Sequence, residues 1–372
     1  MKKQLIVALG LAVLATPAFA SKARLQALGE DQYGSFYIND NRNIFYNAAQ
    51  VNNHKDLVTF EWGDTSNATD TNAAPKAEGG FFKSVGNLVY GVQLGSESNT
   101  SNGFRTAAGA AIEEENNIDL FVGGDAGMKW GANVTYSKSA DDETATDANQ
   151  SALRTRLGVI AGDIEGYANV SLSNKADTGT QEFKGKLGYQ LGAIYNLNEY
   201  RVFADYRSNS GEAEGTVDGD LKASQIQVGA GRASKLNDKA TLFTKAQLQM
   251  NKAENDNGGA FSGTCNFASS LGCEEYSATF IPVVIGLEYD AASWLVLRTS
   301  VSQTIWGKQE DKDNKKGFAE TTTVNAGATL KFGELAVDGV IGNGTAGAGS
   351  DTTDGQLNTD VLMSRVSMTY NF

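Results

Sequence analysis

The last thirteen residues, Asp360 to Phe372 (DVLMSRVSMTYNF), decide the fold. In an extended chain their side chains alternate between two faces, and this period of two predicts a β-strand with two different environments. A soluble domain rarely ends on an amphipathic strand with a large aromatic residue, whereas a closed barrel must pair its last strand with its first. The segment therefore predicts the closing strand of a barrel, with an edge strand of a soluble sheet as the alternative. One face holds Leu362, Ser364, Val366, Met368, Tyr370 and Phe372, and the other holds Met363, Arg365, Ser367, Thr369 and Asn371.

A final phenylalanine after alternating hydrophobic residues resembles the C-terminal signature of Gram-negative outer-membrane β-barrel proteins. The resemblance implies residence in the cell outer membrane, in contact with its lipids and lipopolysaccharide. It also implies that the last strand is the signal read by the barrel-assembly machinery.

The N-terminal residues predict export. Lys2 and Lys3 precede a short apolar run, Leu5 to Leu14, and Ala18-Phe19-Ala20 has the form of a signal-peptidase site. We therefore expect residues 1–20 to be a signal peptide. The mature chain contains no apolar run of the length that a membrane-spanning helix requires.

From residue 57 to residue 372 the sequence alternates between strand patterns and turns. Short turns such as Gly86-Asn87 and Gly333-Glu334 alternate with long polar loops such as Ser139 to Gln150. Short periplasmic turns and long extracellular loops are typical of outer-membrane barrels. We predict an all-β, transmembrane, antiparallel up-and-down β-barrel of about 16 strands, with 14 as the alternative count. The clearer strands include Glu182 to Tyr195, Tyr200 to Ser208, Leu221 to Ala233 and Ala240 to Asn251.

Residues 21–56 do not alternate, and they are rich in asparagine and aromatic residues. We expect this segment either to plug the lumen or to extend into the periplasm. The run Asn43 to Ala49 (NIFYNAA) resembles the YYNPA motif near the start of fatty-acid-transporter barrels, although it lacks the proline. His54 is the only histidine, and we expect it on the surface or in the plug rather than in a catalytic site.

Composition and charge exclude several other functions. Glycine is abundant (42 residues) and proline scarce (3), as in barrels whose strands face water on one side. The net charge of −13 argues against a nucleic-acid partner. Cys265 and Cys273 lie eight positions apart in an exported chain and predict a local disulfide. The sequence offers no metal site, no cofactor motif and no catalytic motif, so we do not expect an enzyme.

Charged residues of the strands mainly share a face with polar or small residues. A charge on the lipid face costs roughly 2–4 kcal/mol near the midplane, so we expect these side chains to point into the lumen. In the porins that the chain resembles, wall bases face the acids of an inward-folded loop across a constriction. The predicted lumen bases are Lys129, Arg154, Arg156, Lys184, Lys186, Arg201, Arg207, Lys245 and Arg298, and the predicted loop acids are Asp141, Asp142 and Glu143. The alternative for each is ordinary lumen solubility or a solvated cell surface.

The sequence thus favours a porin, a passive diffusion channel for ions and small hydrophilic solutes, with a homotrimer left open. The first alternative is a substrate-specific transporter for hydrophobic molecules of the fatty-acid type, with residues 21–56 as a hatch. The second is a structural or adhesive surface barrel whose loops carry the function.

Overall fold

The computed structural model describes residues 21–63, 77–96, 104–105, 108–110, 112, 114, 116–141, 148–216, 218–256, 275–311, 315–317, 322–346 and 365–372. Almost all of the described chain is β-structure, preceded by three short helices. The helices are α2 (Lys22–Ala27), η1 (Asn41–Phe45) and η2 (Ala48–Asn52). The strands of the first half are β1 (Leu57–Trp62), β2 (Glu78–Val85), β3 (Leu88–Leu94), β4 (Ile118–Asp125), β5 (Lys129–Asp141), β6 (Ala148–Ala161), β7 (Ile164–Asp177), β8 (Gln181–Gly185) and β9 (Gly188–Leu197). Those of the second half are β10 (Tyr200–Gly215), β11 (Gly219–Asn237), β12 (Ala240–Asn255), β13 (Glu275–Ala292), β14 (Leu295–Asp311), β15 (Lys315–Gly317), β16 (Thr322–Phe332), β17 (Leu335–Ala346) and β18 (Val366–Asn371).

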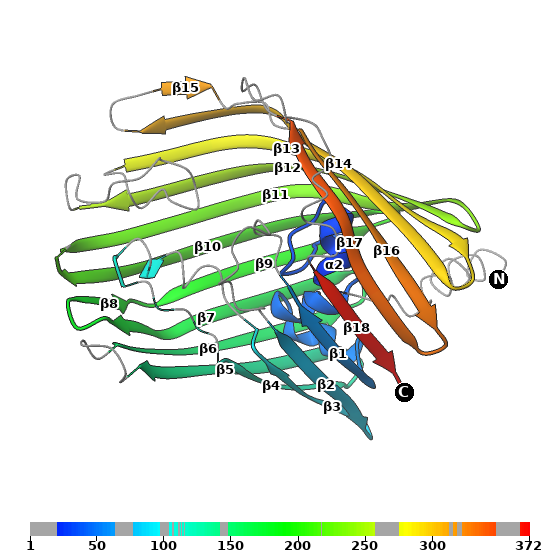
Figure 1. Ribbon diagram of the computed structural model, residues 1–372, viewed down its shortest axis with the longest axis horizontal. Helices are drawn as coiled ribbons and strands as arrows, with labels where there is room; N and C mark the ends of the chain where they lie inside the picture. The colour runs from blue at the N-terminus through cyan, green and yellow to red at the C-terminus, as the bar shows by residue number, and fades with distance from the viewer. Residues whose placement is uncertain are drawn as a thin grey trace.

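The strands form one antiparallel sheet that closes on itself (Figure 1). Both β8 and β9 pair with β7 and with β10, so they are two parts of one barrel strand. The short β15 likewise continues the place of β16 beside β14. The eighteen segments therefore make the predicted barrel of 16 strands. Each strand otherwise pairs with its neighbours in sequence, which is the up-and-down topology.

The barrel closes at its C-terminal strand, as the sequence of residues 360–372 predicted. Strand β18 pairs with β1, from Leu57 opposite Asn371 to Trp62 opposite Val366. The amide of Phe372 donates a 3.0 Å hydrogen bond to the carbonyl of Asp56, and its ring stacks on Phe81 at 5.8 Å. Backbone hydrogen bonds thus join the first and last strands, so neither strand exposes an unpaired edge to lipid here.

Tight turns connect the strands at the end of the barrel where β18 finishes. Gly86 and Asn198 lie in two of these turns with positive φ angles of 60° and 56°, a conformation that glycine and asparagine tolerate best. The longer connections are all at the other end. The turn end is the periplasmic end and the loop end is the extracellular end, as in other outer-membrane barrels.

The outer face carries a broad apolar belt. Many large apolar side chains point away from the lumen, and their exposed fractions reach 62%. A closed barrel with this exterior satisfies its backbone internally and places its apolar side chains in lipid, so it is a transmembrane barrel of the outer membrane. No helix in the described part of the chain is long and apolar enough to span a bilayer. Members of the belt include Phe60, Val92, Leu120, Val134, Leu157, Leu191, Val228, Ile285 and Val301.

Residues 21–56, called the N-terminal segment below, pack against the side of the wall opposite this belt. Helix α2 contacts β14, β16, β17 and β18, and η2 contacts β3, β4, β5 and β6. Phe36 stacks on Phe203 of β10 at 4.7 Å. The segment therefore lies inside the barrel and touches its inner wall on several sides (Figure 1). The division of the chain into three domains, namely signal peptide, N-terminal segment and barrel, remains a prediction.

Candidate functional site

The inner wall has a seat shaped for the backbone of the N-terminal segment. Gly131 of β5 and Gly158 of β6 face η2 and the residue before it. A Cβ atom at Gly131 would overlap the carbonyl of Ala48, and one at Gly158 would overlap the side-chain oxygen of Asn47. The missing side chains let the segment approach the strands at backbone distance.

Buried ion pairs join the N-terminal segment to the periplasmic half of the wall. Arg42 contacts both Glu61 and Glu78, and the Nζ atom of Lys22 lies 3.1 Å from Glu78. On the opposite side, Arg24 lies 3.1 Å from Glu288 of β13. Lys245 of β12 and Arg365, just before β18, also bond to the segment, at 2.6 Å to Glu30 and 2.9 Å to Gln26. Arg42, Glu61 and Glu78 are nearly inaccessible, so removal of Arg42 leaves two carboxylates buried without their guanidinium partner.

Burial also shifts titrations inside the N-terminal segment. Burial raises the pKa of Asp40 to about 6, although Arg24 lies 3.1 Å away and acts in the opposite sense. Burial lowers the pKa of His54 to about 4, with Arg24 and Lys129 adding to the effect. His54 is therefore neutral at ordinary pH, and its Nε2 atom has no hydrogen-bond partner within the described structure. Among the described residues, no group of three or more histidine, cysteine, aspartate and glutamate side chains could hold a metal ion.

Uncharged amides line the wall above the N-terminal segment. On β11 and β12, Gln225 donates to Asn251 at 3.1 Å, and Gln227 donates to Gln249 at 3.2 Å. Gln247 continues this row by donating to Gln249 at 3.2 Å. We call these five residues the amide belt. A surface of this kind offers donors and acceptors but no net charge.

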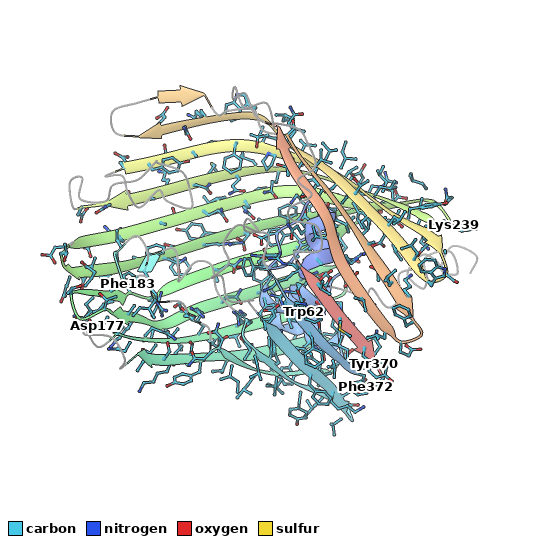
Figure 2. The ribbon with its side chains drawn as sticks, viewed as in Figure 1. Trp62, Asp177, Phe183, Lys239, Tyr370 and Phe372 are labelled. Carbon is cyan, nitrogen blue, oxygen red and sulfur yellow. The ribbon has the colours of Figure 1, made fainter. Side chains whose placement is uncertain are left out.

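On one side of the barrel, the extracellular part of the inner wall is apolar. Inward side chains from β7, β8 and β10 to β13 form a buried cluster with residues of the connection between β3 and β4. Phe183 and Leu221 are 1% and 0% exposed, and the ring of Phe104 lies 6.3 Å from that of Phe183. This is the extracellular apolar cluster: Phe104, Ala108, Ala110, Ala176, Phe183, Ala213, Leu221, Ala253, Tyr276 and Ala278. Figure 2 labels Phe183 and Asp177 at this end of the barrel and Tyr370 and Phe372 at the other.

Two predicted lumen bases lie instead on the outer face. Lys184 follows the inward Phe183 and points the opposite way, where it bonds Glu182 at 2.9 Å and Glu214 at 3.1 Å. Lys186 bonds Glu212 and Asp220, at 2.6 and 2.8 Å. The inward prediction for these two lysines is wrong because it assumed one regular strand over residues 182–195. The break between β8 and β9 changes which parity faces inward.

The other predicted bases do face inward, and most have a carboxylate partner on the wall or in the interior. Arg156 pairs with Asp119 at 2.9 Å, and Arg207 with Asp205 at 3.1 Å. Arg154 pairs with Glu114 at 2.5 Å, Arg298 with Glu288 and Asp338 at 2.6 and 3.0 Å, and Arg201 with Glu165. Lys245 bonds the N-terminal segment as described, and Lys129 donates to Asn53 at 2.5 Å. Their role as a constriction stays a prediction.

Several predicted positions fall outside the described residues. These are the signal peptide at residues 1–20, the loop acids Asp142 and Glu143, and the cysteines Cys265 and Cys273. Asp141 ends strand β5. The predicted disulfide and the predicted acid loop therefore remain predictions.

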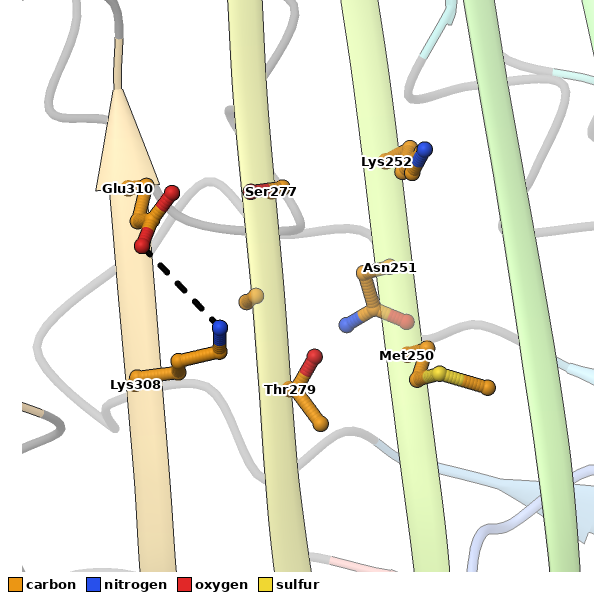
Figure 3. Close-up of a pocket in the computed structure, with 8 residues that line it drawn as sticks. Met250, Asn251, Lys252, Ser277, Thr279, Lys308 and Glu310 are labelled. Atoms are coloured by element: carbon orange, nitrogen blue, oxygen red, sulfur yellow. Dashed lines mark ion pairs between the residues drawn. The ribbon is translucent and has the colours of Figure 1, made fainter.

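A shallow cavity of about 220 Å³ lies across β12, β13 and β14 near their extracellular ends (Figure 3). Its polar lining includes Lys252, Ser277 and Thr279, together with Lys308 and Glu310, which lie 4.0 Å apart. Lys252 and Lys308 are exposed, unlike the inward Asn251 and Ala278. The cavity shares Ala278 with the extracellular apolar cluster and Asn251 with the amide belt.

Sequence reasoning did not predict that the lumen bases pair with carboxylates such as Asp119, Asp205 and Asp338. Each sits at an inward position, and their parity in the sequence was a usable signal. It also missed the extracellular apolar cluster. The sequence signal for this cluster was a reversed pattern near the strand ends, where the charged Glu212 and Glu214 alternate with the small Gly211 and Ala213.

No protein-family model matches the chain, and no curated protein matches its sequence. Among solved structures, the chain is similar to the CymD monoaromatic hydrocarbon channel, with 11% identity over 96% of this chain and 99% of that one, at a TM-score of 0.42. It is also similar to a Pseudomonas aeruginosa FadL homologue, with 11% identity over 95% and 98% of the two chains and a TM-score of 0.43. A third is OmpT, an outer membrane protein of Vibrio cholerae, with 11% identity over 85% and 95% and a TM-score of 0.39.

Proposed function

We propose that this barrel is an outer-membrane transporter for small hydrophobic molecules that carry no net charge, with residues 21–56 as its hatch. The observation that carries the proposal is the vertical order of the inner wall. The extracellular apolar cluster comes first, the amide belt next, and the N-terminal segment last. A general diffusion channel needs a wet inner wall along its whole length, whereas part of this wall is apolar.

The character of the inner wall supports an uncharged substrate. Six of the inward bases, namely Arg154, Arg156, Arg201, Arg207, Lys245 and Arg298, already have carboxylate partners among the described residues. A substrate carboxylate would have to compete for them. The amide belt can instead exchange hydrogen bonds with a hydroxyl, amide or aromatic amine.

The hatch role follows from the contacts of the N-terminal segment around the wall. Its buried ion pairs reach β1 and β2 on one side and β12 and β13 on the other. Passage through the periplasmic half therefore requires the segment to shift or to leave its seat. Apolar contacts hold the segment as well, because Leu28, Phe36 and Ile44 belong to buried clusters shared with the wall.

Transport of two matched dyes tests the proposal. N-phenyl-1-naphthylamine is neutral, and 8-anilino-1-naphthalenesulfonate has the same ring system with a sulfonate. Full-length protein in liposomes should raise the uptake rate of the neutral dye above that of protein-free liposomes and leave the rate of the anionic dye unchanged. Leu221→Asn should slow uptake of the neutral dye about tenfold or more, because it buries an unpaired amide in the apolar cluster. The matched control is Leu236→Asn on the same strand, where the side chain is 57% exposed and outside the cluster.

Planar-bilayer recordings separate this function from a porin. The full-length protein should show little steady conductance, and deletion of residues 21–56 should open a large one. Folding of the deletion variant is checked by its resistance to unfolding in unheated gels. A large steady conductance of the full-length protein, with Leu221→Asn taking up the neutral dye at the original rate, would overturn the transporter and favour the diffusion channel. Equal uptake of both dyes would overturn the uncharged substrate.

A further inference from the structure

A row of lysines crosses the outer face at the extracellular ends of β5 to β8. Lys138 of β5 lies opposite Ser151 of β6, which lies opposite Lys175 of β7. Lys175 in turn lies opposite Lys184 of β8. All four point outward, because their neighbours Ser137, Gln150, Ala176 and Phe183 are buried on the inner side. We call Lys138, Ser151, Lys175 and Lys184 the lysine row.

The charges of the lysine row are not balanced evenly. Lys184 is neutralised by Glu182 and Glu214. Within the described part of the chain, no carboxylate lies within 4.0 Å of the ammonium groups of Lys138 and Lys175. Like charges directly opposite each other on two strands are destabilising, and the carboxylates beside Lys184 bond to that lysine and not to the facing Lys175.

The height of the lysine row matches that of lipid headgroups. Tyr136 lies two residues below Lys138 on the same face of β5 and is 48% exposed. Leu187 and Tyr189 hold a similar level further along the wall, 62% and 36% exposed, and Tyr189 meets Tyr206 edge-to-face at 5.8 Å. Exposed tyrosines of this kind mark the membrane interface. The row therefore sits immediately above the apolar belt.

The wall above the row is acidic. Asp177 lies directly opposite Glu182, two residues beyond Lys175 and Lys184. An anion bound to this face is therefore confined to the level of the lysines. Because neighbouring strands lie about 4.8 Å apart, the backbones at Lys138 and Lys175 are about 10 Å apart. A headgroup that carries two phosphates offers one to each of these lysines.

We propose that the lysine row binds the bisphosphorylated sugar headgroup of an outer-leaflet glycolipid. Lys138 and Lys175 each contact one phosphate, the hydroxyl of Ser151 donates to the sugar or phosphate between them, and the acyl chains lie along the belt below Tyr136. The site lies on the opposite side of the wall from the transport path, so it stands whether or not the proposed transport function does.

Binding of defined lipids to the full-length protein in nonionic detergent tests this site. The probes are lipid A with two phosphates, its monophosphorylated form, and phosphatidylglycerol. Lys138→Glu combined with Lys175→Glu should weaken binding of the bisphosphorylated lipid at least tenfold. The matched control carries the same charge change at the periplasmic end, Lys235→Glu combined with Lys239→Glu, and should bind as the original protein does (Figure 2 labels Lys239).

The outcomes separate the specific site from general attraction. Support requires tighter binding of the bisphosphorylated lipid than of the monophosphorylated form, a loss confined to the Lys138 and Lys175 variant, and retained resistance of that variant to unfolding in unheated gels. Equal loss in the control variant would show a nonspecific charge effect and overturn the site. Equal binding of phosphatidylglycerol would overturn the assignment to a bisphosphorylated sugar. If the doubly reversed variant does not fold, Lys138→Gln with Lys175→Gln must show the same loss.

Discussion

The periplasmic and extracellular halves of the barrel wall differ in which face carries the apolar side chains and which face carries the charged ones. In the periplasmic half, apolar side chains such as Leu157 point outward, while glycines and charged residues such as Glu78 point inward to the N-terminal segment. In the extracellular half of β8 and β10, Lys184 and Glu214 point outward, while Phe183 and Ala213 are buried inside. The alternation has one period throughout, but the surroundings of each face change. Where the wall rises above the lipid, its outer face can carry charges. Its inner face can then be apolar and pack against a ligand or a loop.

The largest effect is expected where the inner charges of the periplasmic half lose a partner. Arg42→Met leaves Glu61 and Glu78 buried beside each other with Lys22 as the remaining close cation. Loss of one partner of a buried pair costs about 3–5 kcal/mol, so the N-terminal segment should leave its seat. Proteolysis of the segment in the folded barrel should accelerate, and steady conductance should appear. The double variant Arg42→Met with Glu78→Gln should recover part of the protection. Unchanged proteolysis in Arg42→Met would show that these pairs do not hold the segment.

Features of the two halves that depend on neighbouring residues could be predicted from the sequence, and features that depend on distant residues could not. The period of two around Phe372 correctly predicted the barrel and its closure, because strand parity is a local property. The predicted strand Tyr200 to Ser208 extends to Gly215 in the structure, because Glu212 and Glu214 pair across strands instead of ending the sheet. Such partners are distant in sequence, so the local pattern assigns their charges to a loop. The reversal of Lys184 came from one local break in pairing that alternation alone does not reveal.

Two titrating groups of the N-terminal segment should respond to pH in opposite directions. The raised pKa of Asp40, about 6, means that the docked segment holds a proton more readily than the released one between about pH 4 and 6. Docking through Asp40 therefore strengthens as pH falls through this window. The lowered pKa of His54, about 4, means that the released segment takes up a proton first, so docking through His54 weakens as pH falls from 6.5 to 4.

Each of these two effects amounts to about 3 kcal/mol when complete, so they nearly cancel. Conductance of the original protein should vary little between pH 6.5 and 4. His54→Gln should lower conductance progressively on acidification, and Asp40→Asn should raise it over the same range. The comparison fails if both variants respond to pH in the same direction.

A steric change at the seat should have an intermediate effect. Gly131→Val places a branched side chain against the backbone of Ala48, and overpacking of this kind typically costs 1–3 kcal/mol. Part of the population should release the segment, giving intermittent conductance rather than a steady opening. Gly166→Val on β7 is the matched control, since the nearest atom to a Cβ there is Val159 Cγ2 at 3.7 Å. Similar intermittent conductance in both variants would assign the effect to the sheet rather than to the seat.

The smallest effect is expected on the outer face of the extracellular half. Lys184→Met removes two ion pairs, at 2.9 and 3.1 Å, but the side chain of Lys184 is 40% exposed and its partners are 38% and 57% exposed. Exposed pairs contribute little to stability, because water replaces the lost partner and salt screens the charges. The urea midpoint of the folded barrel should shift little, and any shift should vanish at high salt. If Lys184→Met destabilised the barrel as much as Arg42→Met releases the hatch, the outer charges would be structural like the inner ones. The two halves would then differ in where their charges lie and not in how much those charges stabilise the structure.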